Sequence, residues 1–218
     1  MKEIIILGTG GNCIDILDAV LELNRSGIQA TYHIRGFLDD NDSDWGKDYF
    51  GYKVLGPLSM AAQLTETQFV NGIGSPRNFW KKKDIIARTG VTEDRFETII
   101  HPRAAVSAFA SVGRGSVILP NATLSARVHV GRNVIILPNA IVSHDVSIGD
   151  YTCVASAACL AGGVHVSESC YIGANSSVNN NVKLGRYSLI GMGATVLKDI
   201  PENSVAVGNP ARVIRNVF

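Results

Sequence analysis

A histidine and an aspartate stand side by side in a stretch whose other residues are mostly small or aliphatic. They are His144 and Asp145, within the segment AIVSHDVSIGD that spans residues 140–150. Histidine is suited to take a proton from an attacking nucleophile near neutral pH, and an adjacent carboxylate can orient the ring and strengthen it as a base. A solvated turn histidine is the plain alternative, so the surrounding pattern has to distinguish the two.

A six-residue repeat surrounds the pair and fills the second half of the chain. Every sixth residue from Val106 to Val196 is Val, Ile or Leu, sixteen positions in all, and turn-forming Gly, Asn and Asp collect just after them. This pattern resembles the hexapeptide repeat of the left-handed parallel β-helix, in which three hexads make one triangular coil of eighteen residues. Burial of sixteen aliphatic side chains contributes roughly 25 to 50 kcal/mol before chain entropy is subtracted. Formation of a core therefore explains the repeat by itself, and function must be sought in other residues.

The histidine and the aspartate lie outside this core. His144 falls two residues after the inward Val142, at a corner between two faces, and the residues one coil further on are Gly162 and Gly163. Two missing side chains beside a corner histidine leave room for a ligand. We therefore predict His144 as a catalytic base and Asp145 as the residue that tunes it.

Residues eighteen apart should stack, because neighbouring coils lie ~4.8 Å apart like other paired strands. One outward stripe is strongly apolar, and it consists of Val117, Ile135, Cys153, Tyr171 and Leu189. An exposed stripe of this length favours a partner surface, and the simplest closed assembly of triangular prisms is a homotrimer. Cys153, within this stripe, lies on the face opposite the corner that carries His144.

The first hundred residues follow another pattern. Strand-like runs EIIILG and TYHIRGFLDD flank the helical spacing of NCIDILDAVLELNRSG, and QFVNGIGS precedes the basic helical run PRNFWKKKDIIART. The sequence thus predicts an α/β plus all-β protein. A Rossmann-like domain with a parallel sheet would cover residues 1–100, and a left-handed parallel β-helix with a C-terminal cap would cover residues 101–218.

The turn after the first predicted strand, GTGGNC, matches a dinucleotide-binding fingerprint only in part. The pattern G-x-G-x-x-G would need glycine where Cys13 stands. Free N–H groups at a helix start still favour a phosphate at this place.

The overall composition narrows the class of partner. Among 218 residues, 20 Lys plus Arg against 19 Asp plus Glu leave a formal charge of +1, which offers neither a nucleic-acid footprint nor a polybasic membrane patch. The first apolar run is too short for a signal peptide or a membrane span, and four cysteines without a CxxC pair favour reduced thiols. We expect a cytoplasmic protein with small-molecule partners, no nucleic acid and no membrane insertion.

Four segments carry a family resemblance: ILGTGGNCIDILDA, GFLDDND, SHDVSIGDY and GMGATVLKDIPENSVAVGNPARVI. Through them the chain resembles, essentially end to end, the hexapeptide-repeat nucleotide-sugar N-acetyltransferases of bacillosamine and perosamine pathways, which share a family with sialic acid O-acetyltransferases. The last segment is typical of hexapeptide acyltransferases in general. The resemblance implies acetyl-CoA as donor, a nucleotide-linked 4-amino-4,6-dideoxy sugar as acceptor, surface glycan synthesis as the purpose, and no metal.

The same resemblance implies roles for single residues. His144 would take the proton of the sugar amine, and Asp145 would strengthen it. Cys153 stands where the family often has a histidine that donates to the thioester carbonyl, and simple interface packing is as good an explanation for it. Because Cys153 and His144 cannot meet within one prism, the resemblance implies an active site between subunits. The remaining donor contacts would be Gly162, Ala174 and Met192, and the acceptor would be held by Gly10, Gly11, Asn12, Asp39, Asp40 and Gly74.

Three other functions stay open at this point. A carbonic anhydrase shares the β-helix but needs three histidine ligands for zinc, and His129, His144 and His165 have a different spacing. A non-catalytic nucleotide-binding trimer could keep the same fold. O-acetylation of a sugar hydroxyl would use the same base.

Overall fold

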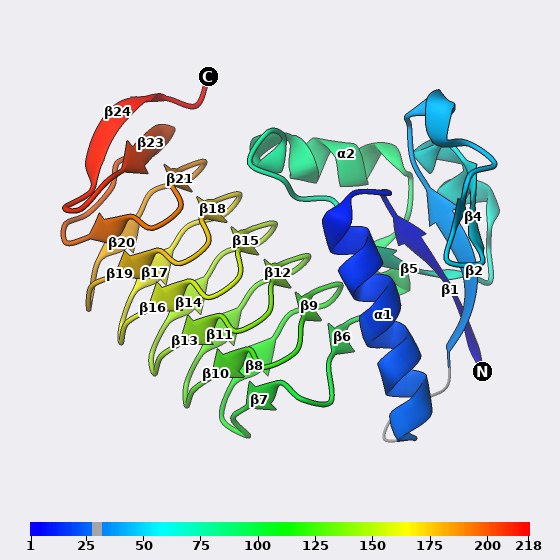
Figure 1. Cartoon of the computed structure of the whole chain (residues 1–218), viewed down its shortest axis with the longest axis horizontal. Helices are drawn as coiled ribbons and strands as arrows, with labels where there is room; N and C mark the ends of the chain where they lie inside the picture. Colours follow the sequence, from blue (N-terminus) through cyan, green and yellow to red (C-terminus); the bar gives the residue numbers. More distant parts are fainter. Residues whose placement is uncertain (28–31) are drawn as a thin grey trace.

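The β-strands of the computed structural model form two parts, a small sheet at the N-terminus and a long stack of two-residue strands after it (Figure 1). The structure describes residues 1–27 and 32–218. The first strand of the stack, β6 (Ile99–Ile100), already pairs with β9 (Val117–Ile118), so the stack begins at Ile99.

The N-terminal sheet has the strand order β3-β4-β2-β1-β5. Strands β1 (Lys2–Leu7), β2 (Tyr32–Leu38), β4 (Tyr52–Gly56) and β5 (Gln68–Asn71) are parallel. The short β3 (Asp48–Tyr49) is antiparallel to β4 and adds a hairpin at the edge, which the sequence did not predict. The parallel core of the Rossmann-like domain is confirmed.

Among the described residues of this domain, two α-helices and four 3-10 helices complete it. Helix α1 (Gly11–Ser26) follows β1 and ends at Gly27, whose φ of 64° is a left-handed conformation that glycine adopts readily. Helix α2 spans Lys82–Arg88, shorter than the predicted helical run. The 3-10 helices are η1 (Asp42–Asp44), η2 (Leu58–Gln63), η3 (Phe79–Lys81) and η4 (Glu93–Arg95).

The stack is a left-handed parallel β-helix with three faces, as predicted. The covered face consists of β6, β9, β12 (Ile135–Ile136), β15 (Cys153–Val154), β18 (Tyr171–Ile172), β21 (Leu189–Ile190), β23 (Ser204–Val207) and β24 (Arg212–Asn216). The uncharged face consists of β7 (Ala105–Val106), β10 (Thr123–Leu124), β13 (Ile141–Val142), β16 (Cys159–Leu160), β19 (Ser177–Val178) and β22 (Thr195–Val196). The ladder face consists of β8 (Ser111–Val112), β11 (His129–Val130), β14 (Ser147–Ile148), β17 (His165–Val166) and β20 (Lys183–Leu184).

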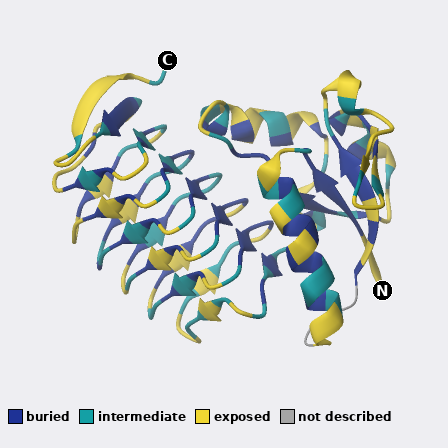
Figure 2. Cartoon of the chain, in the orientation of Figure 1, coloured by how far each residue is buried: buried dark blue, intermediate teal, exposed yellow. Residues whose placement is uncertain are grey.

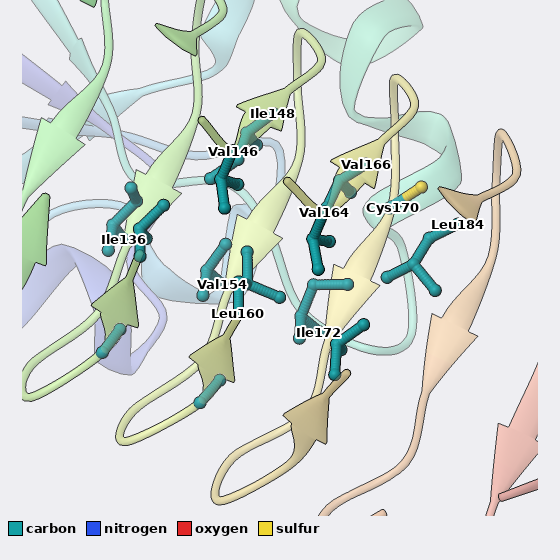
Figure 3. Packing of buried hydrophobic residues seen from close by; sticks show 14 of the residues in the cluster. Ile136, Val146, Ile148, Val154, Leu160, Val164, Val166, Cys170, Ile172 and Leu184 are labelled. Carbon is teal, nitrogen blue, oxygen red and sulfur yellow. The ribbon is translucent and has the colours of Figure 1, made fainter. Parts of the chain in front are cut away.

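The core of the β-helix is built by the repeated aliphatic positions (Figure 3). All of them are buried except Val106 and Val112, which are partly buried at the first coil. From β6 to β22, strand pairing joins each residue to the one eighteen positions later, for example Ile136 to Val154. Inward side chains therefore stack in columns, and the predicted register is confirmed.

The corners of the prism need a left-handed backbone at every sixth residue. Asparagine often fills these positions, as at Asn121, Asn139 and Asn175, because its short polar side chain tolerates this conformation. The residues Arg127 and Asp145 occupy such positions as well, each with a φ of 61°.

The apolar stripe of the covered face lies against the N-terminal domain of the same chain. Figure 1 shows α1 running beside the first strands of this face, and Figure 2 shows the contact surface buried. Ile135 and Cys153 have no exposed surface and belong to one cluster with Ile16 and Leu17 of α1. The prediction that this stripe faces a partner subunit is therefore wrong for Val117, Ile135 and Cys153, which are buried within the chain. Hydrophobicity alone does not reveal which surface covers a stripe.

Polar contacts accompany this apolar contact between the two domains. His101 of the first coil is buried, and its Nε2 lies 2.8 Å from Oε2 of Glu22 on α1. Arg132 of the β-helix bonds to Glu93 at 2.7 Å. These pairs bind the two domains at separate places along the chain.

We expect Ile135→Ala to lower the free energy of unfolding by about 2 to 5 kcal/mol, because it leaves a cavity between α1 and the covered face. Urea unfolding measures this, with Ile214→Ala as control, since Ile214 is 59% exposed. The assembly size should stay unchanged in light scattering. A variant of normal stability that dissociates would mean that Ile135 faces another subunit.

Candidate active site

His144 and Asp145 form a hydrogen-bonded pair at the corner between the uncharged face and the ladder face. Nδ1 of His144 lies 2.7 Å from Oδ2 of Asp145, and 63% of the histidine side chain is exposed. Because an ionised carboxylate only accepts hydrogen bonds, Nδ1 carries a proton, and in the neutral ring Nε2 then has a free lone pair. The pair can therefore accept a proton from a group that approaches from solvent.

Gly162, one coil above, provides the space in which the His144 ring lies. A Cβ atom at Gly162 would stand 2.6 Å from Cε1 and 2.8 Å from Nε2 of this ring. The sequence predicted that the glycine leaves room for a ligand, whereas here the imidazole itself fills part of that room. Gly162 therefore sets the orientation of the base, and a donor contact at this residue remains a proposal.

The Asp145 carboxylate has a second partner that the sequence reasoning missed. Arg127, one coil below, donates from Nε to Oδ1 at 2.6 Å and from its terminal NH2 group to Oδ2 at 2.8 Å. Arg127 first, and His144 second, hold the pKa of Asp145 well below its usual range. The eighteen-residue spacing from Arg127 to Asp145 was the signal that could have revealed this pair.

The two predicted donor contacts Ala174 and Met192 lie at a different corner, between the covered face and the uncharged face. They are one coil apart, and Met192 is 79% exposed. The carbonyl oxygen of Ala174 accepts a hydrogen bond from Gly193 N at 2.9 Å. Within one chain, this Met192 corner and the His144 corner occupy opposite edges of the uncharged face.

A cavity of about 300 Å³ opens at the N-terminus of α1. Among its lining residues are the predicted acceptor residues Gly10, Gly11, Asn12, Asp39 and Gly74. Gly10 caps α1 without a side-chain hydrogen bond, and the first turn has no acidic residue. Such a helix start offers N–H groups and a positive dipole end to an anion.

Side chains from three segments shape this cavity. Asn12 Nδ2 donates to the carbonyl oxygen of Gly74 at 2.8 Å, which joins the start of α1 to the loop after β5. Thr9 Oγ1 donates to Asp39 Oδ2 at 2.9 Å. Tyr171 of the β-helix also lines the cavity, so both domains contribute to it.

Asp40, the other predicted acceptor residue, has a structural contact instead. Its Oδ1 accepts a hydrogen bond from Leu58 N at 3.0 Å, at the first residue of η2. It is absent from the residues that line the cavity. The acidic pair thus divides into Asp39, which faces the cavity, and Asp40, which holds a turn.

Cys13 occupies the place of the third glycine in the dinucleotide-binding fingerprint. Burial raises the pKa of its thiol to about 12. A Cβ atom on Gly8 or Gly72 would collide with its sulfur, so these two glycines create the space that Cys13 fills. Helix α1 therefore still packs closely, although the glycines that make room stand at Gly8 and Gly72 and not at position 13.

Cys153, a predicted donor contact, lies beneath the N-terminal domain with no exposed surface. Cys153 packs against the N-terminal domain of its own chain, so its burial supports neither an open thioester site nor the predicted packing against another subunit. Lys82 of α2 is buried beside it, and its Nζ has no hydrogen-bond partner among the described residues. Burial lowers the pKa of Lys82 to about 8 and raises that of Cys153 to about 11.

The histidines of the ladder face pair with serines. Nδ1 of His129 lies 2.6 Å from Ser111 Oγ, and Nδ1 of His165 lies 2.7 Å from Ser147 Oγ. Within residues 1–27 and 32–218, no three His, Cys, Asp or Glu side chains stand close enough together to hold a metal ion. In the same part of the chain no helix has the length and apolar character to cross a membrane.

Two family models match separate parts of the chain. The PglD N-terminal domain matches residues 3–86, and the bacterial transferase hexapeptide (six repeats) model matches residues 127–162 and 163–198. UDP-N-acetylbacillosamine N-acetyltransferase of Bacillus subtilis (strain 168) is 30% identical over 120 residues, which are 54% of this chain and 51% of that protein. The match thus spans about half the length of the curated relative.

Solved structures match over nearly the whole chain. The acetyltransferase domain of PglB from Neisseria gonorrhoeae FA1090 is 25% identical, with a TM-score of 0.84 over 98% of this chain and 100% of that one. The same domain in complex with acetyl coenzyme A is 26% identical, with a TM-score of 0.83 over 98% and 99%. PerB from Caulobacter crescentus, in complex with CoA and GDP-perosamine, shares the fold at 24% identity, with a TM-score of 0.84 over 99% and 98%. The resemblance inferred from the sequence is confirmed.

We expect Lys82→Met to raise the free energy of unfolding by about 1 to 3 kcal/mol at pH 7, because it removes a buried charge without a partner. Above about pH 8 the folded protein loses this proton, whereas the unfolded chain keeps it up to 10.5. Wild-type stability should therefore rise with pH relative to the variant in this window.

Urea unfolding at pH 7 and at pH 9.5 measures this difference. Lys83→Met is the matched control, since the Lys83 side chain is 50% exposed. If Lys82→Met is less stable than wild type by the same amount at both pH values, the prediction that Lys82 is a destabilising buried charge is wrong.

Proposed function

We propose that this chain, in which a PglD N-terminal domain precedes bacterial transferase hexapeptide repeats, is an acetyl-CoA-dependent N-acetyltransferase. It acetylates the amino group of a nucleotide-linked 4-amino-4,6-dideoxy sugar for surface glycan synthesis. The His144–Asp145 pair carries this proposal, because a bound carboxylate fixes Nδ1–H while Nε2 stays open to an acceptor. The Neisseria gonorrhoeae domain in complex with acetyl coenzyme A supports the donor, and the name of the Bacillus subtilis relative supports the acceptor.

The chemistry follows from the free lone pair on His144. The sugar amine attacks the thioester carbonyl, and Nε2 takes the amine proton as the C–N bond forms. The resulting imidazolium is stabilised by the hydrogen bond from Nδ1 to Asp145. When the tetrahedral intermediate collapses, the C–S bond breaks and the proton passes to the CoA thiolate. The products are the N-acetyl sugar and CoA.

The acceptor would bind in the cavity at the start of α1. Gly10, Gly11 and Asn12 offer a helix N-terminus to the phosphates. Asp39 and Gly74 line the same cavity and would contact the nucleotide. We keep Asp40 out of this set, because its carboxylate bonds to the backbone at Leu58.

We also propose a homotrimer in which the uncharged face, not the covered face, meets the next subunit. This face has Ile141 exposed by 46% and carries no charged side chain on its strands. It lies between the His144 corner and the Met192 corner, so a neighbouring copy would bring the base of one chain to the donor groove of another. Gly162, Ala174 and Met192 would then line that groove.

The protein would work in the cytoplasm, where acetyl-CoA is available. Its cysteines Cys13, Cys153, Cys159 and Cys170 are free, and such thiols persist in a reducing compartment.

Thiol release from acetyl-CoA, measured with a panel of UDP-, GDP- and dTDP-linked 4-amino sugars, tests the reaction. Transfer to one of these amines is the expected result, and mass spectrometry identifies the amide. Acetylation only of a hydroxyl would favour an O-acetyltransferase. Tight nucleotide binding without thiol release would favour a non-catalytic module.

We expect His144→Ala to lower kcat about 100- to 10,000-fold, the range that general-base catalysis contributes. Binding of acetyl-CoA, measured by calorimetry, and the size of the assembly should stay unchanged. His129→Ala on the ladder face is the control and should retain activity. Near-normal turnover by His144→Ala would contradict the proposed base.

We expect Ile141→Lys to dissociate the trimer and to lower activity together with it, because the buried charge would have no partner. Light scattering measures the mass of the assembly. His129→Lys places the same charge on the ladder face and should leave the trimer intact. Dissociation by His129→Lys alone would assign the contact to the ladder face instead.

A further inference from the structure

The Asp145 carboxylate is shared between two coils of the β-helix. Arg127 from the coil below reaches both oxygens, at 2.6 and 2.8 Å, and His144 from the same coil as Asp145 reaches Oδ2 at 2.7 Å. Two parallel bonds from a planar guanidinium fix the plane of a carboxylate. The direction in which Asp145 presents Oδ2 to the histidine is thus set by Arg127.

Nothing in the fold itself requires arginine at this position. Arg127 has a left-handed backbone with a φ of 61°, a conformation that glycine and asparagine tolerate better. Its side chain is 68% exposed, so the core does not need it either. The ion pair with Asp145 is what distinguishes this residue from the asparagines at other corners.

We propose that Arg127 is a positioning residue for the acetyl-transfer reaction. It orients Asp145 and compensates its negative charge, so that Nδ1–H of His144 is held by the carboxylate and Nε2 is directed towards the acceptor. The inference rests on the proposed function only in its kinetic consequences, because the arrangement of the side chains exists without substrate.

Charge compensation follows from the surroundings of the ring. An isolated carboxylate beside an imidazole favours the imidazolium, and a protonated histidine cannot act as a base. Asp145 and Arg127 are the charged groups that the structure pairs here. The other corner residues on neighbouring coils, Ala126, Gly162, Gly163 and Asn180, are uncharged. Removal of the guanidinium would leave the carboxylate charge to act on His144 alone.

The experiment compares wild type, Arg127→Met and Arg127→Lys across pH 5.5 to 9.5 in the transfer assay. For Arg127→Met we expect the acid limb of the kcat profile to move to higher pH by about half a unit to one unit, from a single charge a few ångströms away near the surface. The plateau at high pH should fall about threefold, with KM for acetyl-CoA unchanged. Arg127→Lys should restore the acid limb but not the plateau, because lysine keeps the charge and loses the two-bond geometry.

The chain offers a matched control in Arg132, which bonds to Asp150 one coil above at a different corner, with Nε and NH2 at 2.9 and 2.6 Å from Oδ2. Arg132→Met removes the same kind of pair away from His144, together with the contact of Arg132 to Glu93, and should leave the pH profile in place. An Arg127→Met profile that superimposes on wild type would overturn the proposal. An equal shift of the acid limb in Arg132→Met would overturn it as well.

Nuclear magnetic resonance of ¹⁵N-histidine protein separates this inference from the proposed function. The His144 signals, assigned with His144→Gln, should show Nδ1–H in wild type and a titration midpoint that is higher in Arg127→Met. This measurement needs no acceptor. Absence of transfer with every acceptor would count against the proposed function alone, whereas an unchanged midpoint would count against the role of Arg127.

Discussion

The eighteen-residue register of the β-helix determines where every other feature stands. Stacked aliphatic columns fix this register, because a slip of one residue would turn the columns outward. The outward side chains must then meet at the same interval. Arg127 meets Asp145, Arg132 meets Asp150 and the His144 ring meets Gly162, each across one coil. The repeat that builds the core thus also determines which side chains meet at the corner that carries His144.

Packing of the N-terminal domain on the β-helix is the second constraint. The domain uses α1 to cover one apolar face, and the cavity forms where the start of this helix meets Tyr171 and the loop at Gly74. The cavity therefore depends on both domains holding their positions. The same packing closes access to Cys153 and leaves the uncharged face free for a neighbouring subunit.

Much of this could be predicted from the sequence. Periodicity revealed the coils, the corner and the position of Gly162 one coil from His144, because these are local or differ by a fixed interval. The partner of the apolar stripe and the burial of Lys82 depend on how two domains dock, and burial is not directional. Arg127 was overlooked, although the same interval identifies it. Asp40 looked equivalent to Asp39 because their different contacts arise only in the folded loop.

The fit of the His144 ring against Gly162 also constrains how this corner can evolve. A histidine moved one coil upward would replace Gly162 itself and would require a glycine in place of Asn180. Single substitutions on that route each disturb the corner before the next one can compensate. Positions 144 and 162 are therefore expected to change together across lineages or not at all.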